Sequence, residues 1–448
     1  MRQDAETGDA ESRGAGQSRF PPPTEYLYPF GDEPGQITAE IALSFGPGTD
    51  LSAARIEIPP LKYNKSLLLL LTQDDCKQAA FSTTWAAING RPLSDTYFYN
   101  APHLRGGDMP PDTYSFGKAL GSTDGTGREV RFSFTTAISP EWDYMDDKAV
   151  VRPGFTENYY RFFMRAGLMW DDVIEMLNYG VGIAFHDVNT LSVDVPDSIR
   201  AHFVSSQRIV LDRLAGRGCK TYVAAAEGYD PIQTIFLQSG GEKLRPFAVN
   251  GDLLRTRIER GLWLPAAIPA VIEAQMARPV EEREAVNIGV HEMLLWLNNT
   301  YGRDGEDCLW MPAAEEYFEY NYLRHHAVVN ARVTENTLTL TVEMPGGLYF
   351  YYPSLTINLL GVDPGACTAV GGGETVTGLS WGRGRTADDG AEALMVNFDC
   401  RHALVAHAEH FVAVYEADPS AANRADARYF VAMLKDSDCK ERLLKRIK

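Results

Sequence analysis

The sequence predicts a barrel of parallel strands and helices, followed by an antiparallel β-sandwich domain. Three observations support this α/β fold class. Between residues 60 and 326, short apolar segments alternate with segments of helical periodicity, as in folds built on a parallel sheet. After residue 327, stretches of period two follow one another without helices between them, which is typical of antiparallel sheets. A chain of 448 residues is also long enough for more than one domain.

We divide the chain into three parts. Residues 1–24 are polar, rich in Gly and Ser, and end in three prolines, so we expect a disordered leader. Residues 25–326 are assigned to the barrel, including a half-buried strand at 37–44. Residues 327–448 are assigned to the β-sandwich domain, with helices returning at 420–447.

The clearest strand lies at residues 66–73, where five consecutive leucines are bounded by polar residues. Such a run fits a strand that is buried on both faces, as the core of a parallel sheet requires. Asp74 and Asp75 come directly after it. Because α/β barrels carry their chemistry at the carboxyl ends of the strands, these two aspartates are candidate site residues.

Two histidines follow later strands in the same way. A helix at 156–177 ends near Gly180, and the apolar strand 181–185 leads directly to His186. A helix at 195–215 and a strand at 220–225 come next. The helix at 267–283 is followed by the strand 285–290, which leads to His291. We therefore expect both histidines on the rim that carries the aspartates.

An insertion interrupts the barrel at about residues 95–150. This region is rich in Gly, Pro, Asp and Tyr, and a glycine-rich turn at 121–127 precedes an alternating strand at 128–134. The pattern predicts a β-hairpin. Its position after the first barrel strand suggests that it forms a rim over the site.

The residue types at this rim suit metal-assisted hydrolysis. One of two adjacent carboxylates can bind a metal while the other accepts a proton from water, and imidazole is a common metal ligand. Taken singly, the aspartates also fit a solvated turn, and each histidine fits a hydrogen-bonded structural role. Three rim positions reached from three separate strands favour a shared site.

These segments resemble motifs of the polysaccharide deacetylase (NodB-like, carbohydrate esterase family 4-like) family. Leu-Thr-Gln-Asp-Asp at 71–75 is similar to its first motif, T-F-D-D. The resemblance implies that Asp74 is a general base and that Asp75 binds a divalent metal, with zinc as the first candidate. His-Asp-Val-Asn-Thr at 186–190 is similar to H-[ST]-x-x-H, which makes His186 a metal ligand and puts Thr190 in the place of the second histidine.

The remaining motifs are partly kept. Residues 286–291 resemble the late motif, so His291 is implied to be the general acid. An Arg-and-Pro strand end is expected near 222–229, but neither residue is there. We take Glu227 from that segment and Trp142 from the predicted insertion as candidate substrate-binding residues, the latter because aromatic faces suit sugar rings. Gln73 stands where the family has an aromatic residue.

The resemblance implies a metal-dependent hydrolase that removes N- or O-acetyl groups from a carbohydrate, with a two-domain, deacetylase-like barrel and sandwich. The alternative is a degenerate barrel that binds glycans without hydrolysis, which Thr190 and the missing third motif favour. A third hypothesis, a glycoside hydrolase that uses Glu141 with Glu315, rests on paired carboxylates alone.

Composition restricts the partners. The formal net charge is −18, so we expect no nucleic acid partner. The sequence has no apolar run of the roughly 18 residues that a membrane span needs. The first residues lack a signal-peptide core, so the compartment stays open, and it would be periplasmic or cell-surface if a targeting segment has been removed. The oligomeric state also stays open.

Overall fold

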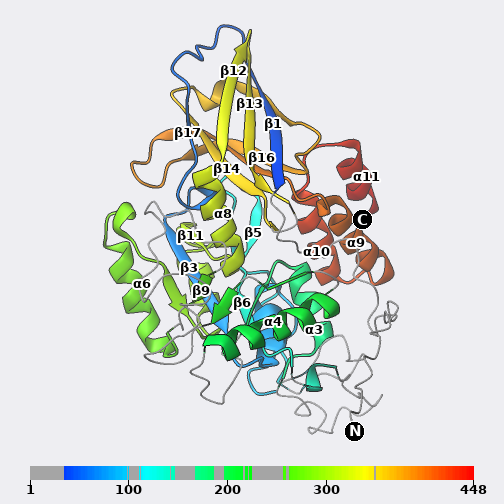
Figure 1. Ribbon diagram of the computed structural model, residues 1–448. Coiled ribbons are helices and arrows are strands. Elements are labelled where there is room, and N and C mark those ends of the chain that lie inside the picture. Colours follow the sequence, from blue (N-terminus) through cyan, green and yellow to red (C-terminus); the bar gives the residue numbers. More distant parts are fainter. Residues whose placement is uncertain are drawn as a thin grey trace, which may run out of the picture.

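The computed structural model describes residues 35–97, 99, 110, 112–141, 143–146, 167–185, 196–214, 217–219, 221–223, 256–258, 262–347 and 350–447. Antiparallel strands gather at one end of the molecule, and the parallel strands with their helices lie at the other (Figure 1). The helix α8 (Ala314–His326) lies between these two parts. The protein is therefore a mixed α/β structure, as the sequence predicts.

The parallel sheet is the scaffold of the candidate site. Its neighbouring strands, in spatial order, are β10 (Val286–Ile288), β3 (Leu67–Gln73), β6 (Thr135–Ile138), β7 (Gly182–Phe185), β8 (Thr221–Val223) and β9 (Thr256–Ile258). A short strand, β11 (Leu309–Trp310), also pairs with the start of β3. Leu262, which follows β9, forms a parallel bridge with Ile288 of β10, so the sheet curls back toward its first strand. A complete barrel stays a prediction.

Strand β3 is buried on both faces, which confirms the interpretation of the leucine run. Leu67, Leu69 and Leu71 join one hydrophobic cluster, whereas Leu68 and Leu70 join another. The alternation follows from the period of two in a strand. Burying one leucine side chain contributes roughly 1.5–3 kcal/mol, so this strand is a major source of core stability.

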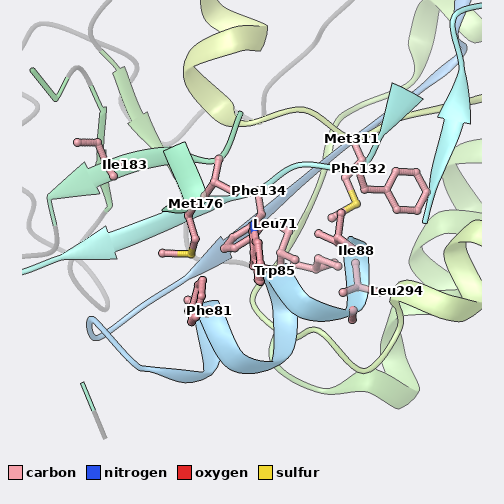
Figure 2. Close-up of a cluster of buried hydrophobic side chains, with 14 of the residues drawn as sticks. Leu71, Phe81, Trp85, Ile88, Phe132, Phe134, Met176, Ile183, Leu294 and Met311 are labelled. Carbon is pink, nitrogen blue, oxygen red and sulfur yellow. The ribbon is translucent and has the colours of Figure 1, made fainter. Parts of the chain in front are cut away.

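The helical segment after the candidate site covers one face of β3. It comprises η2 (Ala80–Trp85) and α1 (Ala86–Ile88). Figure 2 shows Phe81, Trp85 and Ile88 on this segment beneath Leu71 and Phe134. The rings of Phe81 and Trp85 stack with centroids 4.6 Å apart. The segment thus holds the end of β3, and with it the aspartates, against the core.

Predicted barrel helices are present in the described parts. They are α3 (Trp170–Asn178), α4 (Pro196–Arg213) and α6 (Ile268–Met276), and a further helix, α7 (Leu294–Thr300), follows β10. Gly180 has φ = 83°, a left-handed conformation that glycine adopts readily. It lies in the turn that connects α3 to β7. The first part of the predicted helix at 156–177 lies outside the described residues.

The predicted insertion contains more than a hairpin. The described part of this interval contains a hairpin, in which β4 (Gly121–Thr123) pairs antiparallel with β5 (Glu129–Arg131). Strand β4 lies within the segment that we predicted as the turn. The interval also holds β6, which pairs parallel with both β3 and β7. A central strand of the sheet was thus assigned to the insertion. Its sequence, Thr-Thr-Ala-Ile, is too short and too polar for periodicity to separate it from the hairpin.

Eight of the described antiparallel strands form two four-stranded sheets. One has the order β12 (Val328–Thr334), β13 (Thr337–Gly346), β1 (Gly35–Phe45) and β15 (Cys367–Gly372), and the other has the order β16 (Gly378–Arg385), β17 (Glu392–Asp399), β14 (Ser354–Leu360) and β2 (Arg55–Glu57). Both sheets contribute to one hydrophobic cluster. Their packing as a complete sandwich stays a prediction.

The first described strands belong to these sheets. Strand β1 pairs with β13, with Ile41 opposite Leu340, and it also pairs with β15. Strand β2 pairs with β14. Our division assigned this region to the barrel. The strand itself was recognised from its alternating pattern, but such a pattern does not specify which distant strand completes the hydrogen bonds.

Three helices end the described chain, namely α9 (Leu404–Ala417), α10 (Ala421–Ala432) and α11 (Asp438–Arg446). The last two confirm the predicted return to helix at 420–447, whereas α9 lies before that segment and was not predicted. Phe411 and Phe430 stack with centroids 3.8 Å apart inside their cluster. Asp426 accepts hydrogen bonds from Arg91 and Arg131, which ties α10 to the parallel part. None of the described helices has the length and apolarity needed to span a membrane.

Candidate active site

Neighbouring strands bring two of the predicted site positions to one edge of the sheet. Strands β3 and β10 are parallel, with Leu71 opposite Ile288. Asp74 comes directly after β3, and His291 comes three residues after Ile288. Because the carboxyl ends of parallel strands lie at the same edge, this edge carries both a carboxylate and an imidazole. That arrangement is the geometric core of the candidate site.

Asp74 and Asp75 have different environments although they are adjacent. The side chain of Asp74 is buried, with only 4% of the residue exposed. The period of two from Leu70 and Thr72 places Asp74 on their face of the strand. The Asp75 side chain is 50% exposed, and its carboxylate forms an ion pair of 2.8 Å with Lys77. The pair therefore offers one shielded and one accessible carboxylate.

The turn after β3 produces this difference. Asp75 has φ = 63° and Cys76 has φ = 49°, so two consecutive residues adopt the left-handed conformation. Residues other than glycine rarely do so, and they are held there by surrounding contacts. The backbone N–H of Cys76 donates to the carbonyl of Ala137 at 2.9 Å, and its carbonyl accepts from the N–H of Leu168 at 2.8 Å. The turn is thus fastened to β6.

His291 is half-buried at this edge. Burial lowers the pKa of its imidazole below the ordinary value, and the charges of Glu292 and Asp95 act in the opposite direction. A lower pKa makes the protonated ring a stronger acid, while it decreases the protonated fraction at neutral pH. The ring can therefore serve as a proton donor to a basic leaving group.

Gln73 connects the two strand ends. Its side-chain amide, through Nε2, donates to the backbone carbonyl of Gly289 at 3.1 Å, and its Oε1 accepts from the hydroxyl of Thr84 at 3.2 Å. The residue that departs from the family's aromatic position thus has a structural role. It links β3, β10 and the helical segment η2 immediately below the candidate site.

Sequence reasoning missed Trp263. Its indole lies so close to Gly289 that a Cβ atom added there would come within 3.1 Å of the ring. The residue is 42% exposed, and the neighbouring Leu264 is 71% exposed. An exposed aromatic ring near His291 suits the apolar face of a sugar. The available sequence signal is Gly289 itself, since glycine in a strand often marks the close approach of another group.

Four predicted site residues lie outside the described part of the chain. These are His186, Thr190, Glu227 and Trp142. Strand β7 ends at Phe185, directly before His186, and is separated from β3 by β6. The roles assigned to these four residues therefore remain predictions.

The glycoside hydrolase hypothesis is wrong about its carboxylate pair. Glu141 follows β6 at the carboxyl end of the sheet. Glu315 lies at the opposite end, since its Oε1 would be 3.2 Å from a Cβ at Gly182, the first residue of β7. Glu315 is also buried and paired with Arg217. The two carboxylates cannot flank one glycosidic bond.

The donor set at this edge fits a divalent cation in its chemistry. Within the described ranges, no three His, Cys, Asp or Glu side chains are grouped as a metal site. The described part supplies carboxylates, and the other predicted ligands lie outside it. The ion pair between Asp75 and Lys77 is about half exposed. Such pairs contribute only about 0–1 kcal/mol, so a cation can replace the ammonium group.

Comparison with protein families shows the family of the chain. The model of a family described as "Putative polysaccharide deacetylase" matches residues 47–448, which is most of the chain. The protein belongs to this family. The match includes the parallel sheet, the antiparallel strands after 327 and the C-terminal helices, and it confirms the resemblance found in the motifs. A search of curated proteins gives no match.

Proposed function

We propose that this family member is a metal-dependent hydrolase that removes N- or O-acetyl groups from a polysaccharide. The observation that carries the proposal is the pairing of β3 with β10, which brings Asp74 and His291 to one edge of the sheet. A carboxylate base and an imidazole acid are the two proton-transfer groups that acyl transfer to water requires.

Each residue has a role in this proposal. Asp74 accepts the proton of the attacking water, and its burial keeps the carboxylate away from bulk solvent. His291 donates a proton to the departing amine or alcohol. Water adds to the acetyl carbonyl and the bond to nitrogen or oxygen breaks, so acetate and a free amine or hydroxyl are released. A divalent cation held by Asp75, His186 and Thr190 would supply Lewis acidity.

The substrate would extend along the same edge. Trp263 offers an exposed ring for stacking, and Gln73 keeps the strand ends in register by its bond to Gly289. Glu227 and Trp142 remain candidate substrate contacts. Hydrolysis would thus take place at the strand ends, and the surrounding loops would bind the carbohydrate.

Metal content and acetate release test the proposal together. The full chain is purified, loaded with zinc, cobalt or nickel, and assayed on acetylated chitooligosaccharides and acetylated xylan. Asp75→Ala should lose both metal and acetate release. Asp74→Asn should keep the metal and lose at least about 100-fold in rate, the lower end for general base catalysis. Asp363→Ala is the matched control, since its carboxylate is also exposed and ion-paired.

The alternative is decided by the same measurements. If the wild-type protein takes up none of the three metals and releases no acetate, the hydrolase proposal fails. Saturable glycan binding under those conditions would then favour the degenerate barrel, for which the threonine at 190 and the missing third motif already argue.

A further inference from the structure

A cavity lined by both polar and apolar groups lies far from the candidate site in the fold. Its volume is about 140 Å³. A single water needs roughly 10–15 Å³ of such space, so the cavity is large enough for a small organic molecule. The lining comes from the hairpin β4–β5, helix α8, the sheet containing β17 and the C-terminal helices.

The cavity lies at the amino ends of the parallel strands. Tyr63 precedes β3, Ser133 precedes β6, and Gly180 precedes β7, and all three line the cavity. Asp74 and His291 follow the opposite, carboxyl ends of β3 and β10. The cavity is therefore separated from the candidate active site by the length of the parallel sheet.

Charge in the lining is balanced. Its described residues include four cations, Lys62, Arg128, Arg131 and Arg401, and four acids, Asp124, Glu129, Glu316 and Asp399. Ion pairs form within this set, including Lys62 with Glu316 at 2.9 Å and Arg401 with Asp399 at 2.6 Å. An anionic ligand such as phosphate would need a surplus of cations, which this lining lacks. A neutral ligand fits better.

The other lining groups suit a ligand with many hydroxyls. Tyr63, Tyr352, Tyr429 and Phe430 offer aromatic surface. Charged and hydroxyl side chains provide donors and acceptors around them. Ligand sites typically combine apolar walls with a few fixed polar groups, and a sugar unit presents both an apolar face and hydroxyls.

Hydrogen bonds between separate elements hold the walls in place. The Arg128 guanidinium donates to the carbonyls of Leu379, on β16, and Ala432, the last residue of α10. The Asn397 amide on β17 donates to the carbonyl of Asp124 at 2.9 Å. Because hairpin, sheet and helix are joined in this way, the cavity is formed before any ligand arrives.

We propose that this cavity binds a neutral polyhydroxylated ligand of about one sugar unit, independently of the candidate active site. The protein would then hold a glycan at a second point, at the amino ends of the strands whose carboxyl ends carry Asp74 and His291.

Titration of the full chain with glucose, N-acetylglucosamine and inorganic phosphate, followed by calorimetry, tests this inference. The main variant is Ala432→Phe, because Ala432 lines the cavity and a larger side chain would fill it. The matched control is Ala425→Phe, an exposed position on the same helix. Met433→Trp is a second filling variant from the lining. Thermal unfolding of each variant confirms that it folds.

We expect at least one of the two sugars to bind saturably and phosphate not to bind. Ala432→Phe should weaken sugar binding at least about tenfold, whereas Ala425→Phe and Asp75→Ala should leave it unchanged. The inference is overturned if neither sugar binds, if phosphate binds more tightly, or if both folded filling variants bind sugar like the wild type. Loss of binding in Asp75→Ala would overturn it too, while leaving the proposed hydrolase intact.

Discussion

The Gln73 side-chain amide donates a hydrogen bond of 3.1 Å to the backbone carbonyl of Gly289. These residues are the last of β3 and the first after β10, so the bond joins the two strand ends that lead to Asp74 and His291. The residue is buried, and the Thr84 hydroxyl donates to its Oε1. The positions of Asp74 and His291 thus depend on Gln73, which itself has no proposed catalytic role.

Replacing this residue should destabilise the protein. Gln73→Leu keeps the approximate size but leaves the Gly289 carbonyl and the Thr84 hydroxyl without their partner. Leaving a buried polar group unpaired costs about 1–3 kcal/mol, which urea unfolding will measure. The control is Gln36→Leu, whose amide makes an exposed bond of 3.3 Å to Glu343. Equal unfolding free energies for both variants would contradict the linking role.

Removing one partner of the buried ion pair between Arg217 and Glu315 should strongly destabilise the protein. Their side chains are 3% and 1% exposed, and the guanidinium lies over the Tyr351 ring at 3.9 Å. Arg217→Met leaves a buried carboxylate uncompensated, so we expect a loss of about 3–5 kcal/mol. Adding Glu315→Leu removes that charge and should restore much of the stability.

A surface pair supplies the comparison. Lys445 and Glu441 form an ion pair with both side chains more than two thirds exposed. Lys445→Ala should change the unfolding free energy by less than about 1 kcal/mol. If chemical denaturation showed that Arg217→Met lowers the unfolding free energy no more than Lys445→Ala does, burial would not strengthen the Arg217–Glu315 pair.

Acid should destabilise the C-terminal helices through His407. Burial chiefly lowers the pKa of this imidazole to about 3, and the charges of Arg401 and His410 act in the same direction. The unfolded chain, with an ordinary pKa near 6.5, then binds a proton that the folded protein does not. The unfolding free energy should therefore fall between pH 6.5 and 3, with this residue contributing at most about 1.4 kcal/mol per pH unit.

Variants isolate the histidine that causes this dependence. His407→Gln should make the unfolding free energy less steep against pH in that window. His402→Gln changes an exposed histidine nearby and should keep the wild-type slope. Denaturant midpoints at pH 7.5, 6 and 5 give the comparison, and identical slopes for His407→Gln and wild type would rule out the assignment.

Trp263 should affect substrate binding more than stability. If the proposed function holds, Trp263→Ala removes a stacking surface, and KM should rise roughly fivefold or more with little change in kcat, as expected for uniform binding. Trp263→Phe should recover part of the loss. Because the residue is 42% exposed, the melting temperature should change little. A large fall in kcat at unchanged KM would instead indicate that Trp263 acts in the chemical step rather than in substrate binding.

Local patterns were sufficient for much of the framework. The leucine run of β3, the hairpin β4–β5, the strands β7 and β10, and the helices α4 and α6 were all expected from periodicity and turn residues. So was the position of Asp74 directly after β3, whereas His291, expected directly after its strand, follows the end of β10 by three residues. These features depend on burial of one or two faces over a few residues, which a sequence displays directly.

Pairing over long distances was decided by the tertiary structure alone. Strand β6 lies between β3 and β7, and β1 pairs with β13, about three hundred residues away in sequence. The bond from Gln73 to Gly289, the ring of Trp263 and the cavity at the amino ends also unite distant segments. A strand's pattern specifies which face is buried, but its backbone N–H and C=O groups can pair with many other strands. The partner is chosen by the packing of the whole core.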